Sequence, residues 1–195
     1  DSGCTQIGRD ARINRQGRAQ TTLRDPQAFY VTWDDVALRL TWTGADWNHD
    51  GDLFIYLDTI SGGTVETHNP VVTSGESGSV RLGIEADFLV WVQDDQTAQL
   101  WRWDESLGWV ESVSPPLDYV FESSLRTPHT DLSVPWTSLG IDESSGASLA
   151  LVTLATEEDS MAVWATMPVR NPVSSQRLIH DDSFISGDFS AEQAY

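Results

Sequence analysis

The stretch 29–42, Phe-Tyr-Val-Thr-Trp-Asp-Asp-Val-Ala-Leu-Arg-Leu-Thr-Trp, decides the fold. Two runs rich in β-branched and aromatic residues, 29–33 and 37–42, flank the pair Asp34-Asp35, which is typical of a tight turn. The pattern predicts a β-hairpin. Similar short runs, each bounded by Gly, Pro, Asp or Ser, follow at 53–58, 88–92, 100–103, 109–113, 119–121, 131–134, 149–155 and 161–167.

The strand-like runs dominate the chain, because no stretch of ten or more residues carries helical periodicity. About ten strands in 195 residues predict an all-β fold, a two-sheet antiparallel β-sandwich of the jelly-roll-like kind. We expect three parts: an extended basic N-terminal arm at 1–27, the sandwich domain at 28–180, and a tail at 181–195. The tail is either a linker or an added edge strand.

The arm has its own pattern, with arginines at every third position and one more beyond: Arg9, Arg12, Arg15, Arg18 and Arg24. Gly8 and Gly17 argue against a stable helix, and a period of three suits an extended segment with one basic edge. One hypothesis is a frayed linker. The other is a tether that docks on an acidic neighbour, which with the unpaired Cys4 would make the protein a self-assembling cell-surface or filament subunit.

The net charge of −19, from 30 acidic and 11 basic residues, limits the partners. An acidic body repels nucleic-acid phosphates and anionic membrane surfaces. No apolar run approaches the roughly 20 residues that a membrane span needs. We therefore expect neither nucleic-acid binding nor membrane insertion, and the remaining partners are cations, neutral glycans or a basic protein segment.

The strongest local signal is the acidic stretch 46–52, Asp-Trp-Asn-His-Asp-Gly-Asp. Oxygen-bearing side chains stand at alternate positions, and Ca²⁺ takes six to eight oxygen ligands. This spacing predicts a Ca²⁺ site with the ligands Asp46, Asn48, Asp50, Asp52 and, from the following strand, Asp58. The alternative is a turn in which the Asp and Asn side chains cap their own backbone.

The tryptophans separate into two groups. Trp101 and Trp103 alternate along one run and share a face, and we expect them to point into the core with Trp91, because Arg102 suits solvent. Trp47 and Trp109 lie in or beside turns, where loops place binding groups. We predict both as platforms on which sugar rings stack; the alternative is ordinary loop packing.

Catalytic patterns are weak, so the sequence predicts no enzyme. The four histidines lack the i, i+4 spacing of a zinc protease helix, and no nucleophile-elbow pattern occurs. The carboxylate groups at 94–95 and 157–159 fall in polar turns. A non-catalytic binding module is the expectation that remains.

Two motifs carry a family resemblance. The stretch 52–59, Asp-Leu-Phe-Ile-Tyr-Leu-Asp-Thr, followed by Gly62-Gly63 and Asn69-Pro70, resembles a strand of family 9 carbohydrate-binding modules and DOMON-like sandwiches. The stretch 130–140, Thr-Asp-Leu-Ser-Val-Pro-Trp-Thr-Ser-Leu-Gly, is similar to a segment of the same superfamily, found also in glucodextranase C-terminal domains. The resemblance implies a jelly-roll-like sandwich, bound calcium in some members, and sugar or haem binding by a secreted or cell-surface protein.

Overall fold

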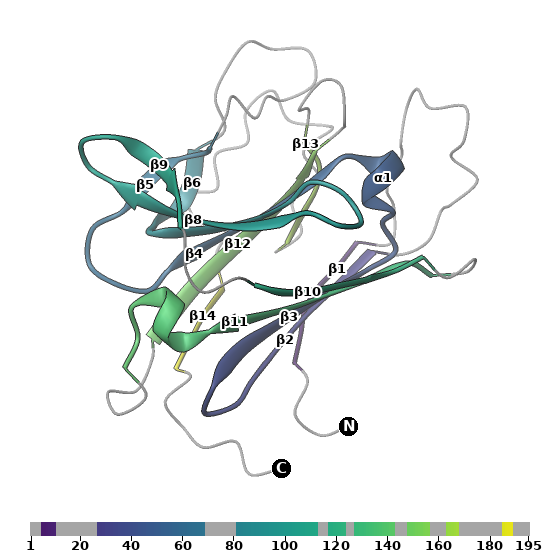
Figure 1. Ribbon diagram of the computed structural model, residues 1–195, viewed down its shortest axis with the longest axis horizontal. Helices are drawn as coiled ribbons and strands as arrows, with labels where there is room; N and C mark the ends of the chain where they lie inside the picture. The colour runs from purple at the N-terminus through teal and green to yellow at the C-terminus, as the bar shows by residue number, and fades with distance from the viewer. Residues whose placement is uncertain are drawn as a thin grey trace.

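The computed structural model describes residues 5–10, 27–68, 81–112, 117–123, 127–142, 148–156, 163–167 and 185–188. They form two stacked antiparallel sheets and a separate two-stranded hairpin (Figure 1). The five-stranded sheet has the order β1 (Thr5–Asp10), β2 (Gln27–Trp33), β3 (Ala37–Thr43), β11 (His129–Pro135) and β10 (Asp118–Glu122).

The larger sheet has seven strands. Its order is β13 (Val163–Met167), β12 (Ser148–Thr156), β4 (Asp52–Asp58), β7 (Phe88–Val92), β8 (Ala98–Asp104) and β9 (Gly108–Glu111), with β14 (Ile185–Asp188) also paired to β12. The separate hairpin is β5 (Thr64–Glu66) with β6 (Arg81–Ala86). Two short helices, α1 (Trp47–Asp50) and the 3-10 helix η1 (Trp136–Leu139), follow β3 and β11. No helix in these ranges is long and apolar enough to cross a membrane.

The predicted two-sheet antiparallel sandwich is confirmed, although the described residues hold fourteen strands and not about ten. The additional strands are β5, β6 and two at the termini. β1 pairs with β2 of the same chain, so the start of the predicted arm is an edge strand of the smaller sheet. β14, which lies in the predicted tail, pairs with β12. Cys4 and residues 11–26 lie outside the described ranges.

The main core fills the space between the sheets. Alternate residues of β3 and β4, such as Leu38, Leu40, Leu53 and Ile55, point into it and are fully or almost fully buried. Two fully or almost fully buried indoles belong to this core, and each indole N–H has an acceptor, as a buried tryptophan requires. Trp42 Nε1 donates to Gln27 Oε1 at 2.7 Å, and Trp47 Nε1 donates to Thr130 Oγ1 at 2.6 Å.

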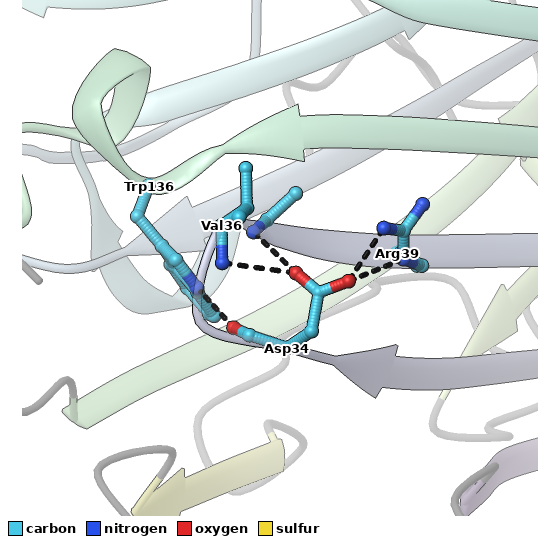
Figure 2. Close-up of polar contacts among 5 residues, drawn as sticks. Asp34, Val36, Arg39 and Trp136 are labelled. Atoms are coloured by element: carbon cyan, nitrogen blue, oxygen red, sulfur yellow. Dashed lines mark hydrogen bonds and ion pairs between the residues drawn. The ribbon is translucent and has the colours of Figure 1, made fainter.

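The β2–β3 turn is fixed by the carboxylate of Asp34 (Figure 2). Its Oδ1 accepts the backbone N–H groups of Val36 and Ala37 at 2.9 and 2.8 Å, and its Oδ2 accepts the guanidinium of Arg39. The Asp34 carbonyl accepts Trp136 Nε1 at 2.8 Å, which joins the turn to η1. Burial would raise the pKa of Asp34, but these hydrogen bonds outweigh it and hold the pKa below its usual value.

Replacing Asp34 by Ala should lower the free energy of unfolding at pH 7 by about 1–2 kcal/mol. The variant lacks the carboxylate that accepts hydrogen bonds from Val36, Ala37 and Arg39. The folded-state pKa is depressed, so this stabilisation is present above pH 3.8 and is lost as the pH falls below it. Urea unfolding at pH 7 and pH 3 measures both effects. The exposed neighbour is the control: Asp35→Ala should change little, and equal losses for the two variants would contradict the role of Asp34.

Candidate functional site

The outer face of the seven-stranded sheet, turned away from the smaller sheet, carries an unusual density of aromatic side chains. We call this surface the aromatic face and define it by Phe54, Tyr56, Trp91, Trp101, Trp103, Trp109 and, from the segment after β5, His68. Strand register sets these residues in rows across the sheet. Phe54 lies opposite Trp91, and Trp103 lies opposite Trp109. Trp101 lies between Leu89 and Glu111.

Strand alternation explains why the tryptophans lie on this face. Along β8, Leu100 enters the main core, so Trp101 takes the outer side, and Trp103 shares it. Along β7, Val90 and Val92 enter the main core and leave Trp91 outside. The expectation that these three tryptophans point into the core between the sheets is therefore wrong, although their shared face is as predicted. Alternation along a strand identifies which residues share a face of the sheet, but it does not identify which face packs against the other sheet.

The hairpin β5–β6 covers only part of the aromatic face. Leu82, Ile84 and Ala86 of β6 pack on the β4–β12 side, over Phe54, Tyr56 and Val152. The four tryptophans on β7, β8 and β9 remain half-buried. In Figure 1 the hairpin lies beyond the seven-stranded sheet, on the side away from the smaller one. Among the described residues, this face of the sheet thus combines fully buried rings with tryptophans that keep part of their surface accessible.

Polar groups are interleaved with the rings and orient them. Trp91 Nε1 donates to Asp52 Oδ2 at 2.8 Å, and Trp101 Nε1 donates to Gln99 Oε1 at 3.2 Å. Trp109 Nε1 donates to the carbonyl of Glu66 at 3.2 Å. Gln99 Nε2 in turn donates to Glu111 Oε1 at 3.1 Å. Sequence reasoning missed Gln99 and Glu111, although Gln99 stands two residues before Trp101 and shares its face.

Trp109 is the second residue of β9, beside the turn at 105–107, and it contacts two rings of the aromatic face. Its ring is edge-on to Trp103 at 5.6 Å and to Tyr56 at 5.8 Å between centroids. The indole is half-buried, so part of its surface faces solvent. Its role as a sugar platform stays a prediction.

Trp47 has a different position from the one predicted. It begins α1, its side chain is 0% exposed, and its ring packs edge-on against Trp42 at 5.9 Å. A sugar ring cannot stack on a side chain with no accessible surface, so the prediction of Trp47 as a surface platform is wrong. The one-turn helix is the physical reason, because it directs the first side chain after Asp46 into the main core.

The acidic stretch 46–52 contains α1 and supplies the side chains that cap its start. Asp46 Oδ1 accepts the N–H of Asn48 at 3.2 Å, and Asp50 Oδ2 accepts the N–H of Asp46 at 2.8 Å. This reciprocal pair is the arrangement that satisfies the free donors of a helix start. The carboxylates of Asp46 and Asp50 thus bond backbone groups of the turn itself, which was the alternative to a calcium site.

The five predicted calcium ligands do not converge. Asp52 bonds the Trp91 indole, and Asn48 Oδ1 accepts the N–H of Asp95 at 3.2 Å. Asp58 ends β4 while Asp52 begins it, so the strand separates them by roughly 20 Å. Within the described ranges, no three His, Cys, Asp or Glu residues gather in a metal-holding group. Asp58 therefore cannot share an ion with the turn, and calcium binding by the turn alone stays a prediction.

Asp58 belongs to a second acidic group, with Glu85 and Asp87. Burial, and then the charges of Asp87 and Glu85, raise the pKa of Asp58 to about 6. Burial also raises the pKa of Asp87, whose Oδ2 accepts the N–H groups of Thr59 and Ile60, both at 2.9 Å. Asp87 thereby holds the loop after β4. A carboxylate engaged by two backbone donors has a structural role, which argues against a catalytic acid–base pair here.

Comparison with known proteins gives no family assignment. No family model matches the chain, and no curated protein matches it. A family 9 carbohydrate-binding module from Caldicellulosiruptor kristjanssonii in complex with cellotriose is similar over 84% of both chains, with 11% identity and a TM-score of 0.38. A second structure, of a family 9 module from the same organism with glucose, covers 86% of this chain and 80% of that one, with 13% identity and a TM-score of 0.37.

These two structures are family 9 modules, the family that the motifs at 52–59 and 130–140 resemble. With TM-scores below 0.5, neither similarity assigns a ligand to this chain. The DOMON-like and glucodextranase-like parts of the resemblance stay predictions.

The cap and calcium accounts of the acidic turn predict different outcomes for Asp50→Ala. Asp50 is 7% exposed, and loss of its bond to the Asp46 N–H should lower the free energy of unfolding by about 1–2 kcal/mol. The cap account expects the same loss with calcium and with a chelator, measured by thermal melting at equal ionic strength. A calcium-induced rise in Tm that both Asp50→Ala and Asn48→Ala abolish would instead establish the ion site.

Asp58→Asn should stabilise the protein in a pH-dependent way. The folded-state pKa is raised from 3.8 to about 6, so ionising Asp58 opposes folding, and wild-type stability falls as the pH rises from about 4 to 6. The variant should match the wild type near pH 3.5 and exceed its Tm above pH 6. Asp118→Asn, at an exposed position of β10, is the control. A Tm difference that is constant from pH 3.5 to pH 8 would contradict this account.

Proposed function

We propose that this chain is a non-catalytic, extracellular glycan-binding module whose ligand surface is the aromatic face. The observation that carries the proposal is the set of four half-buried tryptophans on one sheet face. An indole offers a broad apolar surface that suits the C–H face of a sugar ring, and a flat aromatic side chain loses little entropy on binding. Rings packed on a sheet are already ordered, which lowers that loss further.

The polar groups between the rings support the same function. Gln99 and Glu111 stand beside Trp101, and the carbonyl of Glu66 stands beside Trp109. Sugars present many hydroxyl groups that donate to carboxylate and amide oxygens. Within the described ranges the indole N–H of Trp103 has no hydrogen-bond acceptor, which leaves a donor for a sugar oxygen. Apolar surface with a few directional polar groups is the usual composition of a small-ligand site.

Charge narrows the class of glycan. The net charge of −19 and the carboxylates of Asp52 and Glu111 at the aromatic face disfavour uronates and sulfated sugars by like-charge repulsion. We therefore propose neutral oligosaccharides as the ligands.

Self-assembly through the basic arm and stabilisation by calcium stay predictions. Thr5–Asp10 is paired within its own chain, so an arm exchanged between copies would first have to leave β2. The arginines beyond Asp10 fall in residues 11–26, outside the described ranges. We therefore favour glycan binding over self-assembly as the function of this chain.

Trp109→Ala should weaken binding to neutral oligosaccharides by about tenfold, equivalent to about 1.4 kcal/mol. Trp109→Phe should keep a larger share of the affinity, because a ring remains. A glycan array finds the ligand, and isothermal titration measures the change. Val120→Ala, a 54% exposed position on the other sheet, is the control. A blank array, or equal affinities of Trp109→Ala and wild type, would reject the proposed surface.

A further inference from the structure

His68 lies on the aromatic face and covers Trp101. The two ring centroids are 4.4 Å apart at an interplanar angle of 35°. The imidazole also meets Trp91 edge-on, at 5.3 Å and 61°. Both distances are shorter than those between the other ring pairs of this face, which run from 5.5 to 6.4 Å among the described residues. The imidazole thus occupies part of the surface on which a sugar ring would stack.

The contacts of His68 fix its backbone but leave its ring displaceable. Its backbone N–H donates to Tyr56 Oη at 3.0 Å, which anchors the segment after β5 on the sheet. Within the described ranges, its ring contacts are those with Trp91 and Trp101. Burial lowers the pKa of His68, which keeps the ring neutral at pH 7 and lets it stack as an uncharged group.

Trp103 and Trp109 lie outside the ring contacts of His68, and Trp109 bonds the carbonyl of Glu66 in β5. Trp103 and Trp109 contact each other edge-on at 5.6 Å, and among the described ring contacts neither involves His68. Both indoles are half-buried. Register places this pair one row further along the sheet than Trp101 and Glu111. A short ligand can therefore use Trp103 and Trp109 while His68 remains in place.

We propose that His68 gates the glycan-binding face. Trp103 and Trp109 form an open subsite, and Trp91 and Trp101 form a second subsite that a longer chain occupies only by displacing the His68 imidazole. This inference rests on the proposed function, since it names how that surface is regulated and which chain lengths it favours. A closed second subsite lowers the apparent affinity for long ligands by the fraction of molecules in which it is open.

The cover itself can be tested without any ligand, by oxidative footprinting with a mass readout for each tryptophan. His68→Ala should raise the oxidation of Trp101 several-fold and leave Trp109 unchanged. His129→Ala, a partly exposed histidine of the other sheet, is the matched control and should change neither. His68→Trp, which places a larger ring at the same position, should protect Trp101 further. Equal oxidation of Trp101 in wild type and His68→Ala would overturn the proposal, whether or not a glycan binds.

Titration with neutral oligosaccharides of increasing length then tests the gate. The ratio of the affinity for the longest chain to the affinity for a disaccharide should be about threefold or more higher in His68→Ala than in wild type. Adding Trp101→Ala to His68→Ala should remove that gain. If wild type and His68→Ala bind long chains equally while Trp109→Ala binds them more weakly, the gate is wrong and the binding surface stands. If no variant binds any chain, the gate and the proposed function both fail.

Discussion

Burial of β4 on both of its faces is the constraint on which the rest of the structure depends. Residues 53–57 are all fully buried, so this central strand has no side that could face water. Its inward residues, Leu53, Ile55 and Leu57, build the core between the sheets, and its outward residues, Phe54 and Tyr56, require a second cover. Each buried side chain of this size contributes about 1.5–3 kcal/mol, so neither face can be left to solvent.

Among the described residues, the second cover consists of β6 and of large aromatic rings, and the proposed function uses these rings. β6 packs over the β4–β12 side of the outer face, while tryptophans of intermediate burial lie on β7, β8 and β9. Large rings suit this boundary because an indole can be buried on one side and wet on the other. His68 extends the cover by one more ring. The aromatic face is thus continuous with the packing of β4 and not an independent patch.

Most of the fold could be predicted from the sequence, whereas the site could be predicted only in part. Alternating apolar runs and the Asp34-Asp35 turn are local signals, and the sandwich follows from them. The pattern of Leu82, Ile84 and Ala86 was a usable signal for β6, since these residues alternate with polar or small ones. The outward direction of Trp101 was not predictable, because it depends on which side of the sheet the partner layer covers. Trp47 was misplaced because a single helical turn leaves no periodic signal.

The roles of the acidic residues were also not predictable from the sequence alone. Carboxylates at 34, 46, 50, 87, 94 and 104 accept backbone N–H groups in turns, loops or helix caps. Sequence spacing cannot distinguish such caps from metal ligands, because both uses require Asp and Asn near glycine-containing turns. Part of the net charge of −19 is therefore a consequence of how this chain ends its strands.

Nuclear magnetic resonance of the indole N–H groups during titration with a bound neutral oligosaccharide tests the central claim most directly, because each tryptophan reports separately. The account predicts that Trp103 and Trp109 shift first and furthest, and that the buried Trp42 and Trp47 remain unchanged. Shifts confined to the α1 turn or to the five-stranded sheet, with a silent aromatic face, would contradict it.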